Sequence, residues 1–306
     1  PKNIEVNNFN IKITTLIISQ VRNILKKYKL DKRDISAIGY AGITLDHRPN
    51  LKKSLYLGNP EMLSSMLSIP VISDFRQTDI DAGGQGAPLT GLFHKYLNTI
   101  TNKDLIYLNL GGFANVSIPN KSKLISYDTG PANYLIDTWC REKFDIEFDL
   151  NGRLASMGEI DPELLKLMLK DKYFTKTPPK STGFELFNIN WIKKHLKKNS
   201  FSRDINILAT LTYLTVITVS NDINKYKNKP NSIFFYGGGA FNKLIVQGII
   251  DLTKLKKVKS LRYGIDEKNL EATAFAWLAS MRINRIKFPK SEITGTSKAY
   301  YLGNIY

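Results

Sequence analysis

The sequence predicts an α/β fold, and three observations carry this prediction. Short apolar runs typical of buried strands alternate along the chain with longer segments of helical periodicity. Three of the apolar runs end in a glycine-containing turn, at residues 109–112, 127–130 and 236–239. The length of 306 residues exceeds that of an average domain and predicts two domains.

The elements expected in the first half follow from periodicity and turn residues. Apolar residues at Ile13, Ile17, Val21 and Leu25 form a helical stripe. Pro131 is expected to open a helix, because the first helical turn does not need the N–H that proline lacks. In chain order we expect a helix at 11–29, a strand at 35–40, a helix at 62–67, a strand at 71–73, a hairpin of strands at 105–110 and 114–118, and a helix at 131–139.

The second half repeats the order of strand, glycine turn and helix. A Pro/Lys/Thr-rich loop at 175–182 separates it from the first half. We expect a long apolar helix at 204–221, a strand at 232–236, a turn at 237–239, and helices at 242–251 and 268–282.

Composition excludes several function classes. The net charge of +17 comes from lysine rather than arginine, and without interleaved aromatic residues it disfavours nucleic-acid binding. The single Cys140 rules out an intramolecular disulfide, and with three histidines it disfavours a protein-held metal site. No apolar run reaches the roughly 18 residues of a membrane helix, and no signal peptide is visible. We expect a cytoplasmic protein.

The glycine turns suggest an anion site. A glycine after a strand permits positive φ and lets backbone N–H groups approach a phosphate closely. The simpler alternative is that each glycine only turns the chain. The turns match neither the P-loop nor the dinucleotide-binding pattern, so those folds are disfavoured.

Asp128 and the segment at 73–89 carry the other candidate chemistry. Asp128 lies between a strand and a Gly-Pro turn, where it suits either a general base or a local Asx-turn or helix cap. Arg76, Asp79 and Gln85 lie in a glycine-rich segment that suits recognition of sugar hydroxyls or a carboxylate. As an alternative, Asp74 and Asp79 would only cap a solvated loop.

Seven motifs in order resemble the anhydro-N-acetylmuramic acid kinase family of the actin-like (ribonuclease H-like) ATPase superfamily. The resemblance runs from about residue 10 to residue 306. The motifs are DFRQTDIDAGGQGAPL, LNLGGFANVS, YDTGPANYLIDTW, PPKSTGFELFN, FFYGGGAFN, LEATAFAWLA and EITGTSKAYYLG.

The resemblance implies a two-lobed fold with a central cleft, a first lobe at 1–115 and a second at 116–306, with the last helix and tail able to return to the first. It also implies a homodimer that acts in peptidoglycan recycling. The implied reaction is the phosphorylation of 1,6-anhydro-N-acetylmuramic acid by ATP, with Mg²⁺ as cofactor, while water opens the anhydro ring. Asp128 would activate the water. The implied nucleotide-binding residues are Gly111, Gly112, Gly130, Gly237, Gly238, Gly239 and Asn242, and the implied substrate-binding residues are Arg76, Asp79, Gln85, Asn133 and Glu271.

The chain departs from the family pattern in its first lobe. The family's glycine- and threonine-rich phosphate hairpin has no counterpart in residues 1–30. Ala41, Ile43 and Thr78 replace a histidine, a glutamine and an arginine of the pattern. We therefore expect a first lobe without its N-terminal hairpin. The alternative function is an impaired relative that binds nucleotide or cell-wall sugar without efficient turnover.

Overall fold

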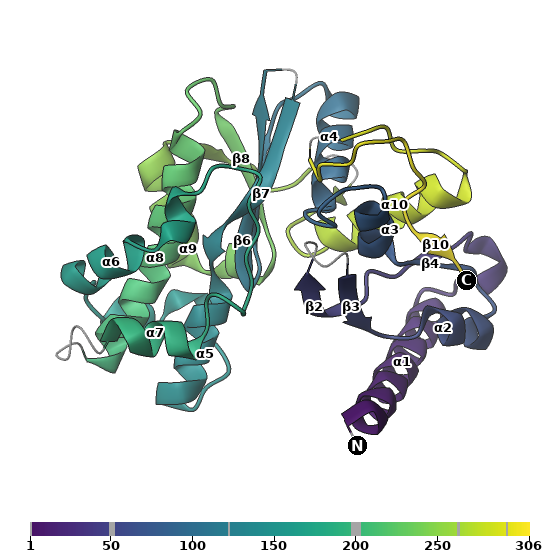
Figure 1. Ribbon diagram of the computed structural model, residues 1–306, viewed down its shortest axis with the longest axis horizontal. Helices are drawn as coiled ribbons and strands as arrows, with labels where there is room; N and C mark the ends of the chain where they lie inside the picture. Colours follow the sequence, from purple (N-terminus) through teal and green to yellow (C-terminus); the bar gives the residue numbers. More distant parts are fainter. Residues whose placement is uncertain (1, 49–52, 122, 197–202, 262–263, 292) are drawn as a thin grey trace. The chain divides into compact units, whose positions relative to one another are not determined.

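The computed structural model describes residues 2–48, 53–121, 123–196, 203–261, 264–291 and 293–306. Contacts divide the chain into two units, of which the first comprises residues 1–93 and 271–306 and the second residues 94–270. The predicted boundary at residue 115 therefore differs from the division after residue 93. Residues 94–115 belong to the second unit because the strand at 106–110 hydrogen-bonds to strands of that unit on both sides. Figure 1 traces the chain from end to end.

The second unit is built on one mixed sheet. Its strands are β5 (Ile106–Leu110), β6 (Phe113–Asn120), β7 (Lys123–Pro131), β8 (Ser232–Tyr236) and β9 (Lys256–Lys257). They lie in the order β7-β6-β5-β8-β9, with β6 antiparallel to both neighbours and the remaining pairs parallel. If the five strands of this unit are numbered 1 to 5 in chain order, they lie in the order 3-2-1-4-5, and strand 2 is the antiparallel β6. This arrangement characterises the ribonuclease H-like fold. The predicted fold class is confirmed.

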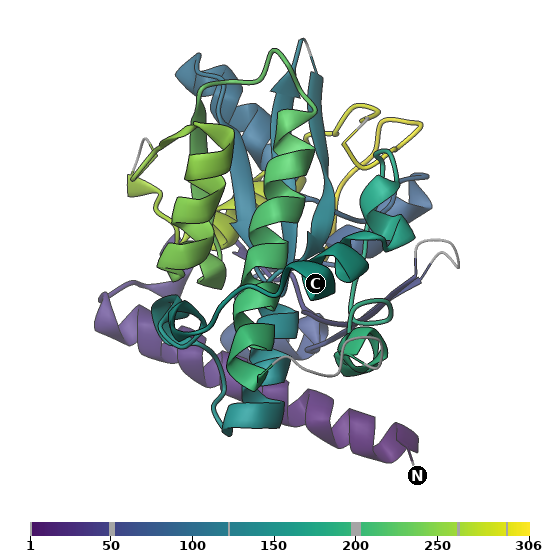
Figure 2. The same cartoon turned by 90° about the vertical axis from the view of Figure 1, so that its left-hand side faces the viewer.

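Helices of the second unit cover this sheet and complete its core. Figure 2 shows α8 (Asp204–Asn224) and α9 (Lys243–Thr253) in front of the strands. α8 is apolar nearly all round and is buried accordingly, and Val219 packs with Val116 of β6 in one core cluster. The other helices are α4 (Thr90–Thr101), which begins in the first unit, α5 (Asn133–Phe144), α6 (Pro162–Leu169) and α7 (Ile189–Leu196).

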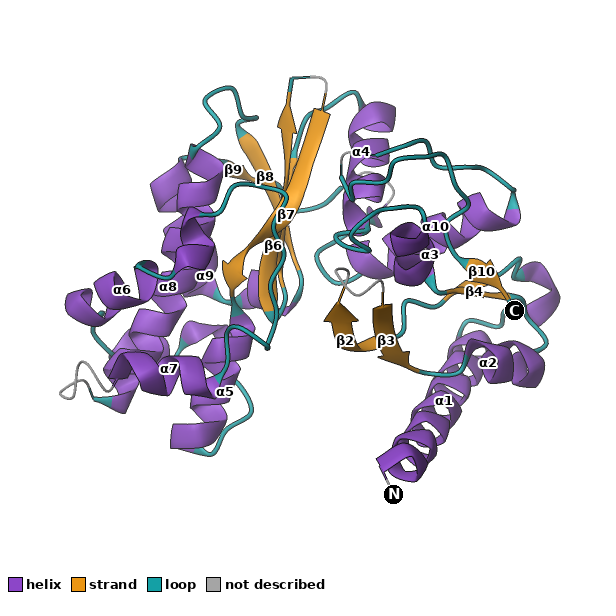
Figure 3. Cartoon of the chain, viewed as in Figure 1, coloured by secondary structure: helices purple, strands orange, loops and turns teal. Residues whose placement is uncertain are grey.

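The first unit contains two small sheets and joins both ends of the sequence. β4 (Val71–Ser73) pairs in parallel with β1 (Ile38–Gly39) and antiparallel with β10 (Asn304–Ile305). β2 (Ile43–Arg48) and β3 (Lys53–Leu57) form an antiparallel pair, shown in orange in Figure 3. The helices are α1 (Lys2–Lys27), α2 (Pro60–Leu67), α3 (Phe75–Asp81) and α10 (Leu270–Ile283).

Several predicted elements differ from the structure. The helix expected at 11–29 begins nine residues earlier, at Lys2, and ends at Lys27. Pro131 ends β7 instead of opening a helix, because it still pairs with Phe113 of β6, and α5 begins at Asn133. The strand expected at 35–40 is confined to Ile38–Gly39. No helix in the described part of the chain combines the length and apolar character needed to cross a bilayer.

Candidate nucleotide and catalytic site

The glycine turns after β5 and β8 lie against each other in the second unit. These two strands are parallel neighbours, so their carboxyl ends share one edge of the sheet. Gly237 has φ of +82°, and a Cβ there would come within 2.4 Å of Asn109 Oδ1. A Cβ on Gly239 would come within 2.7 Å of Leu110 Cβ. Only glycine allows this approach, and the structure brings the predicted turns together.

Asn133 joins the two turns. Its Nδ2 donates to the Leu110 carbonyl at 2.9 Å, and its backbone N–H donates to the Gly111 carbonyl at 3.1 Å. A Cβ on Gly239 would lie 2.9 Å from Asn133 Oδ1. The structure therefore places this residue, expected on the substrate side, among the glycines expected to bind nucleotide.

A cavity of about 550 Å³ opens beside these turns. Its two aromatic lining residues are accessible, since Phe148 is 56% and Phe241 is 40% exposed. Such apolar faces, bordered by a few polar groups, suit a flat heteroaromatic ring. Lys268 Nζ lies 5.7 Å from the centre of the Phe241 ring. The cavity is lined by Asn133, Ile136, Asp137, Phe148, Asp149, Leu150, Asn151, Gly238, Phe241, Asn242 and Lys268.

Asn242 has a structural task besides lining the cavity. It is the N-cap of α9, and its Oδ1 accepts from the N–H groups of Leu244 at 3.1 Å and Ile245 at 3.3 Å. The cap occupies the side-chain oxygen. Only the amide nitrogen is left for the ligand contact that the resemblance implies.

Asp137 is a cavity residue that sequence reasoning missed. It follows Asn133 by four residues on α5, so both side chains lie on the same helix face. Burial raises the pKa of Asp137 to about 6, partly opposed by the charge of Arg141. The i, i+4 spacing from Asn133 is the signal that could have identified it.

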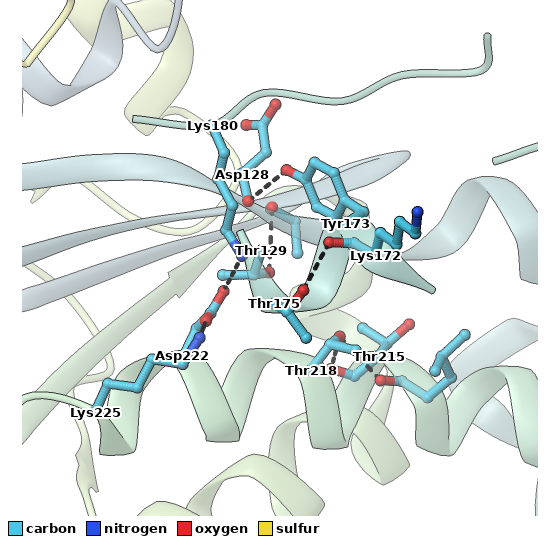
Figure 4. A network of polar contacts seen from close by, with 12 residues as sticks. Asp128, Thr129, Lys172, Tyr173, Thr175, Lys180, Thr215, Thr218, Asp222 and Lys225 are labelled. Atoms are coloured by element: carbon cyan, nitrogen blue, oxygen red, sulfur yellow. Dashed lines mark hydrogen bonds and ion pairs between the residues drawn. The ribbon is translucent and has the colours of Figure 1, made fainter. Parts of the chain in front are cut away.

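Asp128 lies within β7 and is held by three contacts that are distant in sequence, and Figure 4 draws the one from Tyr173. Its Oδ2 accepts from the Thr182 N–H at 3.0 Å, and its own N–H donates to the Lys180 carbonyl at 3.1 Å. Its carbonyl accepts from the Tyr173 hydroxyl at 2.7 Å. The N-cap of α5 is Ala132, and the Thr182 contact spans 54 residues. The helix-cap alternative for Asp128 is therefore wrong.

A row of polar side chains crosses the sheet from Asp128. Asp128 pairs with Asn115, and Asn115 pairs with Asn109, so the three side chains lie on one face. The Oδ1 atoms of Asn109 and Asn115 are buried without a hydrogen-bond partner among the described residues. Sequence reasoning missed Asn115, although its symmetric placement with Asn109 about the turn predicts that they meet.

Gly130 has a packing reason that is separate from nucleotide binding. Its φ is +153°, and a Cβ there would meet the Phe174 ring at 2.8 Å. The structure thus places this glycine beneath an aromatic side chain of the loop after α6. Its predicted role in nucleotide binding stays a prediction.

In the first unit, Asp79 is buried and its carboxylate is enclosed by donors. It accepts from Thr294 Oγ1 at 2.8 Å, the Tyr300 hydroxyl at 2.5 Å and the Gly86 N–H at 2.7 Å. Burial raises its pKa, and these hydrogen bonds oppose the shift. The side chain is fully buried and organises the loop, and its predicted contact with substrate stays a prediction.

Arg76 and Gln85 lie on the loop that Asp79 organises. Arg76 Nη1 donates to the Gly86 carbonyl at 2.9 Å, and the N–H of the exposed Gln85 donates to the Thr294 carbonyl at 2.6 Å. Glu271 is exposed in the first turn of α10, and no hydrogen bond joins it to those two side chains or to Asp79. The structure brings Arg76, Asp79 and Gln85 together but leaves Glu271 separate from them.

Thr78, which replaces an arginine of the family pattern, has a structural role here. Its hydroxyl accepts from the Gly303 N–H at 2.8 Å and donates to the Asp74 carbonyl at 3.1 Å. The hydrogen bond from Gly303 connects the C-terminal segment to α3. Ile43, which replaces a glutamine, lies in β2 with 51% of its surface exposed.

A ribonuclease H-like sheet with facing glycine turns beside an open aromatic cavity is the arrangement of the actin-like ATPase class, and this chain is a carbohydrate kinase of that class. The chain belongs to the anhydro-N-acetylmuramic acid kinase family, whose model matches residues 3–306.

Two curated relatives carry the same description. The chain is 36% identical over 293 residues to the anhydro-N-acetylmuramic acid kinase of Pseudomonas syringae pv. tomato, covering 95% of this chain and 80% of the relative. It is 37% identical over 307 residues to that of a Sulfurovum species, covering 99% and 83%. Among solved structures, the activator of the 2-hydroxyisocaproyl-CoA dehydratase from Clostridium difficile matches at a TM-score of 0.44 and 13% identity, covering 87% and 81%.

Proposed function

We propose that the protein transfers the γ-phosphoryl group of ATP to 1,6-anhydro-N-acetylmuramic acid and opens the anhydro ring with water. The observation that carries this proposal is the carboxylate of Asp128, fixed by long-range backbone contacts on the sheet whose strand ends hold the facing glycine turns. Family membership supports the substrate class.

The nucleotide would bind in the second unit. Backbone N–H groups of the turns at 111–112 and 238–239 would donate to phosphate oxygens, as glycine corners do in other phosphate sites, whereas the Gly237 N–H donates to the Glu267 carbonyl at 3.3 Å. Phe148 and Phe241 would contact the adenine, and Lys268 would bring positive charge to the same cavity. Asn242 would contact the adenosine through Nδ2.

Asp128 would act as a general base. It would take a proton from a water molecule as the water oxygen attacks C1 of the sugar. The C1–O6 bond then breaks, O6 takes the γ-phosphoryl group, and ADP leaves with the electrons of the broken P–O bond. The products are N-acetylmuramic acid 6-phosphate and ADP. Positioning is the protein's main contribution to such a transfer, which fits an aspartate whose carboxylate accepts from the Thr182 N–H and whose own N–H donates to the Lys180 carbonyl.

Magnesium would be held mainly by phosphate and water. No group of three or more His, Cys, Asp or Glu side chains in the described ranges could enclose a metal ion. The orphaned amide oxygens of Asn109 and Asn115 are ligands of the kind that Mg²⁺ accepts, directly or through water. When bound, the ion would neutralise charge developing on the transferred phosphoryl group.

The sugar would be recognised from the first unit by Arg76 and Gln85, with Asp79 supporting their loop from inside. Glu271 is a further candidate because it is exposed at the start of α10. The homodimer, the cytoplasmic location and the role in peptidoglycan recycling stay predictions.

The test is the substitution Asp128→Asn. The variant should form no detectable N-acetylmuramic acid 6-phosphate, whereas its melting temperature and its affinity for ATP should match the wild type, since asparagine retains an oxygen for the Thr182 N–H. Asp145→Asn is the matched control, because Asp145 is an exposed acid of the same unit with φ of +52°, which asparagine tolerates. Its turnover should be unchanged.

Two results would redirect the proposal. Wild-type turnover by Asp128→Asn would show that another group is the base. An unaltered chain that binds ATP but makes no product would favour the impaired relative, for which the altered positions Ile43 and Thr78 are the specific observation.

A further inference from the structure

The loop that contacts Asp128 carries a buried ion pair that the reaction described above does not use. Lys180 Nζ lies 2.9 Å from Asp222 Oδ2, and the two side chains are only 2% and 3% exposed. Lysine is almost never buried to this degree. Its ammonium group also lies 5.1 Å from the centre of the Tyr173 ring and 5.4 Å from that of Tyr127.

The backbone at this lysine and just after it holds Asp128. The Lys180 carbonyl accepts from the Asp128 N–H, and the N–H of Thr182, two residues later, donates to the Asp128 carboxylate. Tyr173, whose ring borders the ammonium group, donates its hydroxyl to the Asp128 carbonyl. Figure 4 shows the Tyr173 contact with Asp128 of β7 and the pairing of Lys180 with Asp222 of α8. The position of the carboxylate therefore depends on where Lys180 holds its loop.

We propose that Lys180, anchored on α8 by Asp222, is a positioning residue for Asp128. This inference rests on the proposed role of Asp128 as base. α8 packs in the main core of the second unit, so Asp222 gives the loop a fixed attachment point. Displacing a reacting group by about 1 Å can lower a rate by about 10²-fold. A loop of proline, lysine and threonine has few apolar side chains of its own to hold it.

A purely structural role for the pair is the competing explanation, and the geometry argues against it. Buried ion pairs contribute little net stability, because desolvation offsets their attraction. Asp222 has a second cation, Lys225, whose side chain is 50% exposed and comes from α8's own C-terminal cap. The carboxylate would remain paired without Lys180. What Lys180 adds is the link to the loop.

The test compares Lys180→Met with Lys225→Met. Lys180→Met should lower kcat by about 10²-fold while KM for ATP stays within about twofold, because the nucleotide cavity contains no residue of this network. Rates are expressed per molecule that binds a non-hydrolysable ATP analogue, which removes any loss due to unfolding. Lys225→Met should retain wild-type kcat, and Lys180→Arg should recover part of the loss.

Amide hydrogen exchange supplies a readout besides activity. Peptides containing Thr182 should exchange faster in Lys180→Met and not in Lys225→Met, because the Thr182 N–H loses its fixed carboxylate acceptor. If Lys180→Met does not fold, Lys180→Gln, which keeps a donor for Asp222, should show an intermediate loss of kcat with the same KM.

The outcomes separate this inference from the proposed function. An inactive Asp128→Asn together with wild-type kcat in Lys180→Met would overturn the positioning role alone. Loss of ATP affinity in parallel with kcat would also overturn it, since the pair would then support the unit as a whole. An active Asp128→Asn would instead overturn the base on which the inference rests.

Discussion

The acidic side chains of this protein differ in burial and in the number of hydrogen-bond donors around them. Asp79 of α3 and Asp128 of β7 both precede glycines in the sequence, and both were candidate site residues. Three donors enclose the Asp79 carboxylate, whereas one backbone N–H contacts that of Asp128, and their exposure differs in the same sense. Two of the donors around Asp79, Thr294 and Tyr300, lie more than 200 positions away, so local sequence could not predict its burial.

Asp137 provides a pH-dependent prediction at the residue scale. Its pKa in the folded protein is raised to about 6 from an ordinary value of 3.8, so the folded state binds its proton more readily than the unfolded state does. Ionised Asp137 therefore destabilises the fold above about pH 6, and this cost disappears as the pH falls toward about 4.

Asp137→Asn should raise the free energy of unfolding by about 1 kcal/mol at pH 7.5, allowing for partial solvent screening. Denaturant titrations between about pH 4 and pH 8 provide the measurement. The advantage of the variant should shrink steadily toward the acid end. A difference that did not change with pH would contradict the assigned shift.

At the scale of elements, the glycines of the turn after β8 serve two different purposes, close packing at Gly239 and ligand access at Gly238. Gly239 lies where a Cβ would meet Leu110 Cβ at 2.7 Å, whereas a Cβ on Gly238 would find only Asn133 Nδ2, at 3.7 Å. Gly238 also lines the cavity. Neighbouring glycines in one motif are therefore required for different reasons.

Gly239→Ala should destabilise the protein by about 1 to 3 kcal/mol, because the added methyl group overpacks the contact between two strand ends. Gly238→Ala should leave the melting temperature nearly unchanged but weaken ATP binding by at least about tenfold, since its methyl group would project toward the ligand. Calorimetric titration with ATP and thermal unfolding of both variants distinguish the two effects. Equal losses of stability would contradict this division.

At the scale of the whole molecule, the first unit needs both ends of the sequence. β10 pairs with β4, the Gly303 N–H donates to Thr78, and Tyr300 donates to the buried Asp79. The fold of residues 71–86 therefore depends on residues 300–305, more than 200 positions away.

Tyr300→Phe should lower the free energy of unfolding by about 1 to 3 kcal/mol, because it removes a donor from a buried carboxylate. The adjacent Tyr301 is 39% exposed, and Tyr301→Phe is the matched control with an expected change below about 0.5 kcal/mol. Urea unfolding measures both. Equal stability of the two variants would show that the Asp79 network contributes nothing to the first unit.

The sequence by itself determined the α/β class, the strand–glycine–helix order and the family, because these depend on periodicity, turn chemistry and ordered motifs. It also located the turns that meet after β5 and β8. The tertiary structure decided that Pro131 remains in a strand, that Asp79 is enclosed, and that Lys180 is paired with Asp222. Each of these depends on a partner from a distant segment, and local patterns carry no information about which segment that will be.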